Sequence, residues 1–211
     1  MQSWTEYSRF VIALFAILTP FAAIPLFLNL TAGQSEKERA RTARTAVLTI
    51  AILLVSSALL GDAILRLIGT SLDSFRVGGG IVLLLMALSM LSAQVSSVQQ
   101  TPDEVREAIN KDAVGVVPIG IPLLAGPGSI SAVIIQMERS ADYFHQALII
   151  ACILFVCGLV WGALALATFI GERLGRTGLN ILNRIFGLLL AAIAVEVIAA
   201  GLRGLFPGLT G

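Results

Sequence analysis

Two proline pairs inside long apolar runs are the residues of this chain best placed to do chemistry. One motif runs from Thr19 to Pro25 and the other from Ile121 to Pro127. Both read Pro-x4-Pro, at an offset of 102 residues. Proline removes a backbone donor and clashes with the preceding turn. We therefore expect each pair to break the helix that contains it.

A helix that begins inside a membrane presents unpaired N–H groups and a partial positive charge, which suit a carboxylate. The residues that follow the second pair supply small groups, a hydroxyl cap and a new helix start. The first motif offers two small alanines, Ala22 and Ala23, and an amide further along. The predicted substrate site draws on both motifs and comprises Thr19, Pro20, Ala23, Pro25, Asn29, Pro122, Gly126, Pro127, Gly128, Ser129 and Ser131.

One ionisable residue, Glu196, lies near the middle of the last apolar run. An uncompensated carboxylate there costs at least about 2.5–3.5 kcal/mol, so we expect it to face a cavity. It would act in proton coupling or bind a substrate ammonium; the alternative is a protonated or hydrogen-bonded packing residue. His145, the only histidine, lies at a helix entrance and is expected to take no part.

Catalytic and metal-binding patterns are missing from the apolar runs. The sequence shows no Ser/His set, no paired aspartates and no metal-ligand cluster there. Cys152 and Cys157 are five residues apart, which places them on different faces of a helix. We therefore predict that the protein is not an enzyme and holds no cofactor or metal.

The elements that must position these residues are transmembrane helices. The chain is 57% hydrophobic and 13% charged, with a mean hydropathy of +0.92, whereas soluble domains carry about 25% charged residues. A span needs about 20 apolar residues. The first run is too long for a signal peptide, so we predict an all-α membrane protein whose six spans are Arg9 to Leu30, Thr45 to Ile68, Val77 to Ala93, Ala113 to Met137, Gln146 to Ile170 and Leu182 to Leu202.

Positive charges are distributed unevenly between the two sides of these spans. The loops at residues 31–44, 92–112 and 171–184 carry nine Lys and Arg residues, and the opposite side carries five. Because cytoplasmic loops are enriched in Lys and Arg, both termini are predicted to lie outside the cytoplasm.

The two halves of the chain correspond in order. The second and fifth runs share the offset of the proline pairs, and Arg76-Val77-Gly78-Gly79 parallels Arg184-Ile185-Phe186-Gly187. Each half contains three spans, so the second half enters from the opposite side, which makes an inverted repeat. We predict a single domain with repeat 1 at residues 8–94, a cytoplasmic linker at 95–112 and repeat 2 at 113–204.

Three blocks of this sequence resemble the MarC family of bacterial and archaeal inner-membrane proteins. They are Pro118 to Ile130, Asn183 to Leu190 and Arg76 to Ile81. The resemblance covers essentially the whole chain. It implies six spans and transport of small neutral amino acids such as glycine and alanine. The first motif departs from the family, because many members carry polar residues where this chain has Thr19, Ala22 and Ala23.

The sequence and the resemblance together predict a secondary transporter of small neutral amino acids that works by alternating access in a bacterial plasma membrane. A passive channel for small solutes and a non-transporting membrane scaffold are the alternatives. The expected partners are a small neutral amino acid and the lipid bilayer, with no nucleic acid. The coupling ion, H+ or Na+, and assembly into a homo-oligomer stay open.

Overall fold

The computed structural model describes residues 4–92, 126–140 and 142–210, and within these ranges every regular element is a helix. The long elements are α1 (Trp4–Leu18), α2 (Pro20–Leu30), α3 (Glu36–Ile68), α4 (Leu72–Leu91), α6 (Pro127–Met137), α7 (Tyr143–Ala165) and α8 (Ala167–Leu205). A short 3-10 helix, η2 (Pro207–Thr210), follows α8. The predicted all-α class is thus confirmed for the described residues.

Local sequence signals account for several of these helix boundaries. Ser35 begins α3 with a capping box, in which its hydroxyl accepts from the Glu38 N–H and the Glu38 carboxylate accepts from the Ser35 N–H. Such a box satisfies two of the four donors that a helix start leaves free. Gly69 ends α3 in the left-handed conformation, with φ 75°. Ser71 and Asp142 cap α4 and α7 in the same way as Ser35, by accepting from backbone N–H groups.

In the part of the chain that the structure describes, five helical segments are long and apolar enough to cross a membrane. They are Trp4–Leu30, which combines α1 and α2, then Glu36–Ile68, Leu72–Leu91, Tyr143–Ala165 and Thr177–Leu205. Helix α6 is apolar but has only 11 residues. It matches the end of the fourth predicted span, whose first part, like the predicted linker and Pro122, lies outside the described residues. The predicted multi-pass membrane protein is therefore supported, with five long candidate spans.

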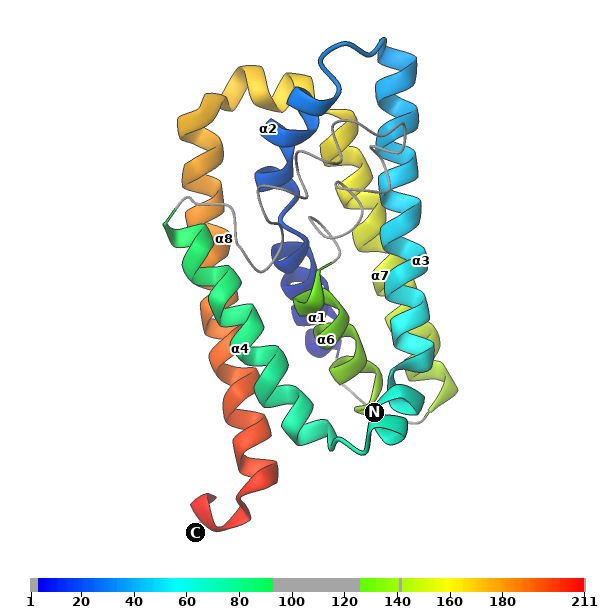
Figure 1. Ribbon diagram of the computed structural model, residues 1–211, viewed down its shortest axis with the longest axis vertical. Coiled ribbons are helices and arrows are strands. Elements are labelled where there is room, and N and C mark those ends of the chain that lie inside the picture. Colours follow the sequence, from blue (N-terminus) through cyan, green and yellow to red (C-terminus); the bar gives the residue numbers. More distant parts are fainter. Residues whose placement is uncertain (1–3, 93–125, 141, 211) are drawn as a thin grey trace.

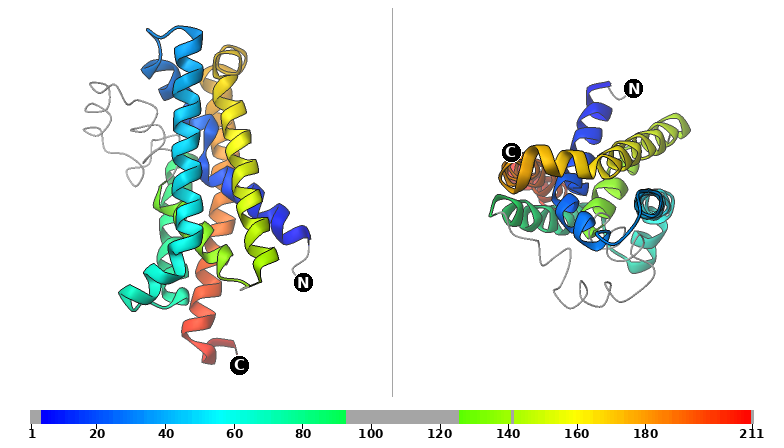
Figure 2. Two further views of the ribbon diagram at one scale, coloured as in Figure 1. Left: turned by 90° about the vertical axis from the view of Figure 1, so that its right-hand side faces the viewer. Right: turned by 90° about the horizontal axis from the view of Figure 1, so that it is seen from above.

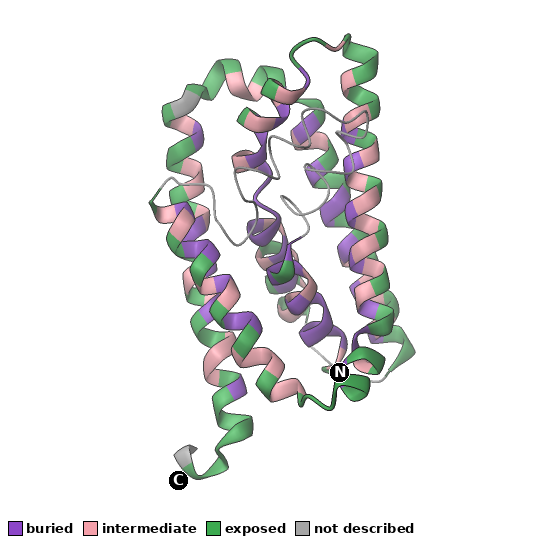
Figure 3. Ribbon diagram, viewed as in Figure 1, coloured by how far each residue is buried: buried purple, intermediate pink, exposed green. Residues whose placement is uncertain are grey.

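The helices form one elongated bundle with both described ends of the chain at the same end (Figures 1 and 2). Buried residues gather along α1, α2 and α6 in the middle of the bundle, while the outer helices expose one face (Figure 3). Large apolar side chains occupy those outer faces, among them Ile52, Leu59, Phe155 and Leu188. An apolar exterior of this kind suits contact with lipid.

The short central helices pack across the two halves of the chain. Helix α2, from the first half, contacts α7 and α8, whereas α6, from the second half, contacts α3 and α4. The largest helix contact joins α4 to α8 along much of their length (Figure 1). Each half therefore supplies the surface on which the central helix of the other half rests.

Glycines allow α4 and α8 to approach closely. A β-carbon on Gly187 would lie 3.1 Å from the Ala87 carbonyl oxygen and 2.9 Å from Met90 Cβ. A β-carbon on Gly80 would lie 2.6 Å from Ile198 Cγ1. Small residues at such contacts are the usual means of packing helices in membranes.

Helix α8 differs from the sequence-based prediction at its start. Residues 171–184 were expected to form a loop, but α8 begins at Ala167 and continues through them with a kink at Gly175. Gly175 has φ 59° and ψ −175°, a conformation that is essentially confined to glycine. The segment before this kink lies across one end of the bundle, and the segment after it runs along α4 (Figure 1).

Candidate functional site

The first predicted helix break lies at Thr19, directly before the first proline. Helix α1 ends at Leu18 and α2 begins at Pro20, with Thr19 between them at φ 45° and ψ 51°. Pro20 has no N–H to donate to the preceding turn. The Thr19 N–H donates to the Ala16 carbonyl over 3.3 Å instead. Thr19 is buried, so the break lies inside the bundle.

The break leaves polar backbone groups at the end of α1. In the described part of the chain, no hydrogen bond reaches the carbonyl oxygens of Ile17 or Leu18. The last carbonyls of a helix carry a partial negative charge and suit a cation or an ammonium group. Pro25, by contrast, stays inside α2 without ending it. Only the first proline of this pair therefore coincides with the end of a helix.

The second proline motif ends at the start of α6, and its residues before Gly126 lie outside the described ranges. Gly126 precedes the helix in an extended conformation and Pro127 occupies its first turn. The Ser129 hydroxyl donates to the Gly126 carbonyl over 2.8 Å, so it does not act as the expected cap for an N–H group. Gly126, Gly128, Ser129 and Ser131 are all buried, whereas Pro127 is exposed. The start of α6 is thus a buried helix end with a partial positive charge.

These two helix ends lie against each other and against α4. A β-carbon on Gly128 would lie 3.8 Å from Ile17 Cγ2, in the last turn of α1. It would also lie 2.8 Å from Leu83 Cδ2 and from Met86 Sδ, both on α4. In Figure 1 the start of α6 lies near the middle of the bundle, at about the height of the gap between α1 and α2. Glycine at residue 128 is what allows this contact.

Ser131 continues this contact along α6. A β-carbon on Gly79 would lie 2.7 Å from Ser131 Cβ and 2.9 Å from its Oγ. Ser131 therefore packs against the glycine run at residues 78–80, in the first half of α4. The packing of α6 on α4 thus brings the helix that begins at the second proline motif against this glycine run.

Three predicted site residues lie apart from the two helix ends. Pro25 and Asn29 are exposed on α2, away from the buried break. Glu196 was expected to face a cavity but lies on an exposed face of α8, and it forms no ion pair or hydrogen bond with any described residue. Glu196 is exposed because of its position around the helix. The face of α8 that packs inward is the one that carries Ala194 and Gly201.

Pro25 lines a separate cavity of about 350 Å³. Its other walls are Leu28 on α2 and a set of residues on α8: Thr168, Gly171, Glu172, Gly175 and Leu179. The side chain of Arg39, on α3, reaches this wall, with Nη1 donating to Thr168 Oγ1 over 2.9 Å. Arg39, Thr168 and Glu172 were not predicted as site residues, because nothing in the sequence showed that the part of α8 before the kink would cross over α2.

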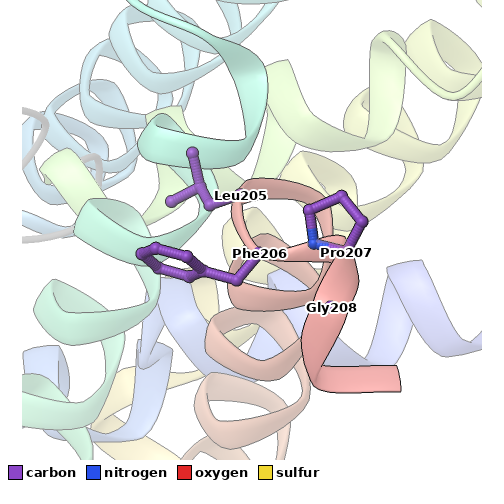
Figure 4. A pocket seen from close by; sticks show the side chains of 4 residues that line it. All are labelled: Leu205, Phe206, Pro207 and Gly208. Atoms are coloured by element: carbon purple, nitrogen blue, oxygen red, sulfur yellow. The ribbon is translucent and has the colours of Figure 1, made fainter. Parts of the chain in front are cut away.

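A larger hollow of about 650 Å³ lies at the C-terminal end of the chain. It is lined by Leu205, Phe206, Pro207 and Gly208 (Figure 4). None of these residues has a polar side chain, and all four are exposed. The hollow therefore offers nothing that could orient a polar ligand.

A buried hydrogen-bond chain connects α1, α6 and α7 at the end where the chain begins. Tyr7 Oη lies 2.9 Å from His145 Nδ1, and His145 Nε2 lies 3.0 Å from the Gln136 carbonyl oxygen. A carbonyl can only accept, so Nε2 carries the proton and Nδ1 accepts from the tyrosine hydroxyl. His145 was expected to take no part in any site; it is buried and holds three helices together.

Metal-binding groups are not found in residues 4–92, 126–140 and 142–210, where no three His, Cys, Asp or Glu side chains cluster suitably. The two cysteines, Cys152 and Cys157, are free thiols. The polar groups gathered at the helix ends are mostly backbone atoms. Such an arrangement can bind and orient a small charged solute.

Apolar spans surrounding two buried helix ends define a polytopic integral membrane protein. The chain belongs to the MarC family, because the family model for "MarC family integral membrane protein" matches residues 4–206. This result confirms the resemblance seen in the sequence.

Relatives from distant bacteria match over nearly their whole length. The UPF0056 membrane protein YhcE of Escherichia coli is 40% identical over 205 residues, which cover 96% of this chain and 94% of that protein. YvbG of Bacillus subtilis is 36% identical over 200 residues, covering 94% and 95%. The UPF0056 membrane protein of Aquifex aeolicus is 33% identical over 209 residues, covering 96% and 97%. No solved structure gives a significant match.

Proposed function

We propose that this protein is a secondary transporter of small neutral amino acids that works by alternating access. The observation that carries the proposal is the meeting of two buried helix ends of opposite polarity, at Thr19 and at Gly126–Ser129. Interrupted helices in the two halves of a membrane protein are the usual location of a transporter's substrate site. Transport of glycine and alanine is also what the family resemblance leads us to expect.

The chemistry of the two ends suits a zwitterion. The start of α6 offers backbone N–H groups, and the Gly128 N–H has no partner in the described part of the chain, so a substrate carboxylate can bind there. At the end of α1, the carbonyls of Ile17 and Leu18 accept no hydrogen bond from any described residue, so they can accept from an ammonium group. The Thr19 hydroxyl and Ser131 complete the polar set.

Alternating access requires two parts that can move relative to each other. The packing of α2 on α7 and α8, and of α6 on α3 and α4, supports two inverted three-helix repeats. In this arrangement the substrate site lies where the repeats meet, which is the usual location in such folds. The predicted repeat boundaries at residues 94 and 113 belong to this proposal.

The remaining features of the proposal concern location and coupling. The protein lies in a bacterial plasma membrane with both termini outside the cytoplasm. Transport is coupled to H+ or Na+, and the chain works alone or as a homo-oligomer. Glu196 is exposed on α8 and has no ion pair or hydrogen bond with a described residue, so it would couple a proton only after gaining a polar partner. The proposal assigns no catalytic residue, in line with the prediction that the protein is not an enzyme.

Purified protein reconstituted in proteoliposomes tests the proposal. We expect saturable uptake and exchange of glycine or alanine. The double variant Gly126→Leu/Ser129→Ala should abolish transport while still purifying as a folded protein. Gly158→Leu is the matched control, because a β-carbon at Gly158 meets no atom within 4 Å.

Two results would contradict the transporter. One is the absence of uptake and exchange for every neutral amino acid in correctly oriented protein. The other is a flux that does not saturate with solute concentration, which would indicate a passive channel instead.

A further inference from the structure

The cavity between α2 and the start of α8 is a second place where a polar solute can bind. It lies beside Pro25, away from the buried break at Thr19. Its volume of about 350 Å³ falls at the small end of the range for ligand sites, about 300–1,000 Å³. The cavity is therefore large enough for a small amino acid with some water.

Arg39 does not itself line this cavity, but its positive charge lies beside Thr168, which does. Besides donating to Thr168 Oγ1, the guanidinium donates from Nη2 to the Thr31 carbonyl over 3.3 Å. Its Nε atom is buried and has no hydrogen-bond partner among the residues that the structure describes. Arginine carries five N–H donors in a fixed plane, which match the two oxygens of a carboxylate. Two of its donor atoms are thus occupied, and the group retains free donors for an anion.

Glu172 places a negative charge on the same wall, one helix turn after Thr168. Residues four apart lie on the same side of a helix, and both of these line the cavity. Among the described residues, Arg39 and Glu172 form no ion pair with each other or with any other group. The wall of the cavity therefore carries the Glu172 carboxylate, the Arg39 guanidinium is hydrogen-bonded to the same wall at Thr168, and no ion pair joins these two groups.

The walls that hold these charges are fixed by two glycines. A β-carbon on Gly171 would lie 3.0 Å from Leu28 Cδ1, so α8 passes α2 at close range. Gly175, with its positive φ, turns the chain so that the segment before it crosses the end of the bundle. The cavity thus depends on the kink in α8.

We propose that this cavity is a second binding site for a zwitterionic amino acid, with Arg39 binding the carboxylate and Glu172 the ammonium group. The substrate class rests on the proposed transport function, whereas the site and its charges rest on the structure alone. The cavity lies at the end of the bundle that carries the α2–α3 loop, which is predicted to face the cytoplasm. It receives the solute on the cytoplasmic side of the central break.

The first test measures glycine transport from each side of the membrane in oriented proteoliposomes. Arg39→Gln and Glu172→Gln should each raise the half-saturating glycine concentration about tenfold on the cytoplasmic side only. Arg39→Lys should raise it less, because the charge remains. Arg41→Gln and Glu36→Gln are the matched controls, since both residues are exposed on α3, and neither lines this cavity or forms the hydrogen bond to Thr168 that Arg39 forms. Equal behaviour of Arg39→Gln and Arg41→Gln would overturn the site.

The second test does not depend on transport. Thr168→Cys, in a chain whose Cys152 and Cys157 are replaced by alanine, is labelled with a thiol reagent. Glycine should slow the labelling, whereas acetate or methylammonium alone should slow it little, because each supplies only one charge. Phe169→Cys is the control, since Phe169 is exposed but does not line the cavity. Equal protection by acetate would overturn the zwitterion assignment.

The two proposals fail in different ways. Protection of the cysteine at residue 168 by glycine, without any flux through the wild-type protein, would overturn transport and support the cavity site. Saturable flux without protection and without an effect of Arg39→Gln would overturn the cavity site and support the transporter.

Discussion

Thr19 holds a left-handed backbone conformation that is uncommon outside glycine and asparagine and unfavourable for a β-branched residue. Such a conformation costs of order 1–3 kcal/mol and persists only where the surroundings enforce it. The sequence predicted a break near Pro20, because proline lacks the N–H that a helix needs. It could not show that the break would precede the proline or that Pro25 would remain helical. Both depend on packing between distant segments.

Charged residues at the end of the bundle that holds the chain termini make the stability of the folded protein depend on pH. The pKa of Glu138 lies above its ordinary value of 4.5, because burial and the nearby Asp62 carboxylate both raise it while Arg66 lowers it. The folded protein therefore binds this proton more tightly than the unfolded chain does. The stabilising effect is complete below the ordinary pKa and is lost as the pH rises through the raised pKa.

We expect Glu138→Gln to make the protein more stable at neutral pH. The variant should also lack the loss of stability that Glu138 causes as the pH rises. Thermal unfolding in detergent at a series of pH values between 4 and 8 measures the effect. Arg66→Gln should extend the decline to higher pH, because it removes the cation that lowers the Glu138 pKa. A wild-type protein whose stability rises over this window relative to Glu138→Gln would contradict the assignment.

At the scale of helices, hydropathy predicted the spans well and their ends less well. Apolar runs are long and continuous, so their positions follow from composition. The crossing segment at the start of α8 was missed because it carries charges, including Glu172 and Arg173, and was therefore expected to be a loop. The kink at Gly175 also has no periodic signal. Glycine permits a left-handed conformation without requiring it.

The contact between α4 and α8 yields a prediction from paired glycines. Gly187→Ala should lower the free energy of unfolding by about 1–3 kcal/mol, because the β-carbon would meet backbone atoms of Ala87 and Leu91. Gly158→Ala should leave it unchanged or raise it by about 0.5–1 kcal/mol, since alanine favours the helix and the site is open. Unfolding in mixed micelles compares the two variants. Equal destabilisation by both would show that α4 and α8 are not packed this closely.

For the whole molecule, the structure places both described ends of the chain at one end of the bundle (Figure 2). This agrees with an even number of membrane crossings. The distribution of Lys and Arg predicts that this end lies outside the cytoplasm. The orientation stays a prediction from the sequence. The packing of α2 on α7 and α8 could be seen only in the structure, because contacts between distant apolar segments leave no signal in hydropathy.

Reporter fusions test this orientation. Alkaline phosphatase fused after residue 211 should be active, since the enzyme folds only outside the cytoplasm, and green fluorescent protein at the same place should stay dark. A fusion within the loop between α2 and α3, near Gly33, is the control and should give the opposite pair of signals. A fluorescent C-terminal fusion would reverse the orientation and move the proposed Arg39 site to the other side of the membrane.

The packing of each central helix on the other half of the chain has a consequence for biosynthesis. When α2 leaves the ribosome, the surfaces of α7 and α8 that will cover it have not yet been made. Helices α1 to α4 must therefore remain in the membrane with α2 incompletely covered. The bundle can close only after α8 has been inserted. Two separately expressed halves should consequently stabilise each other, while either half alone would be a ready substrate for membrane proteases.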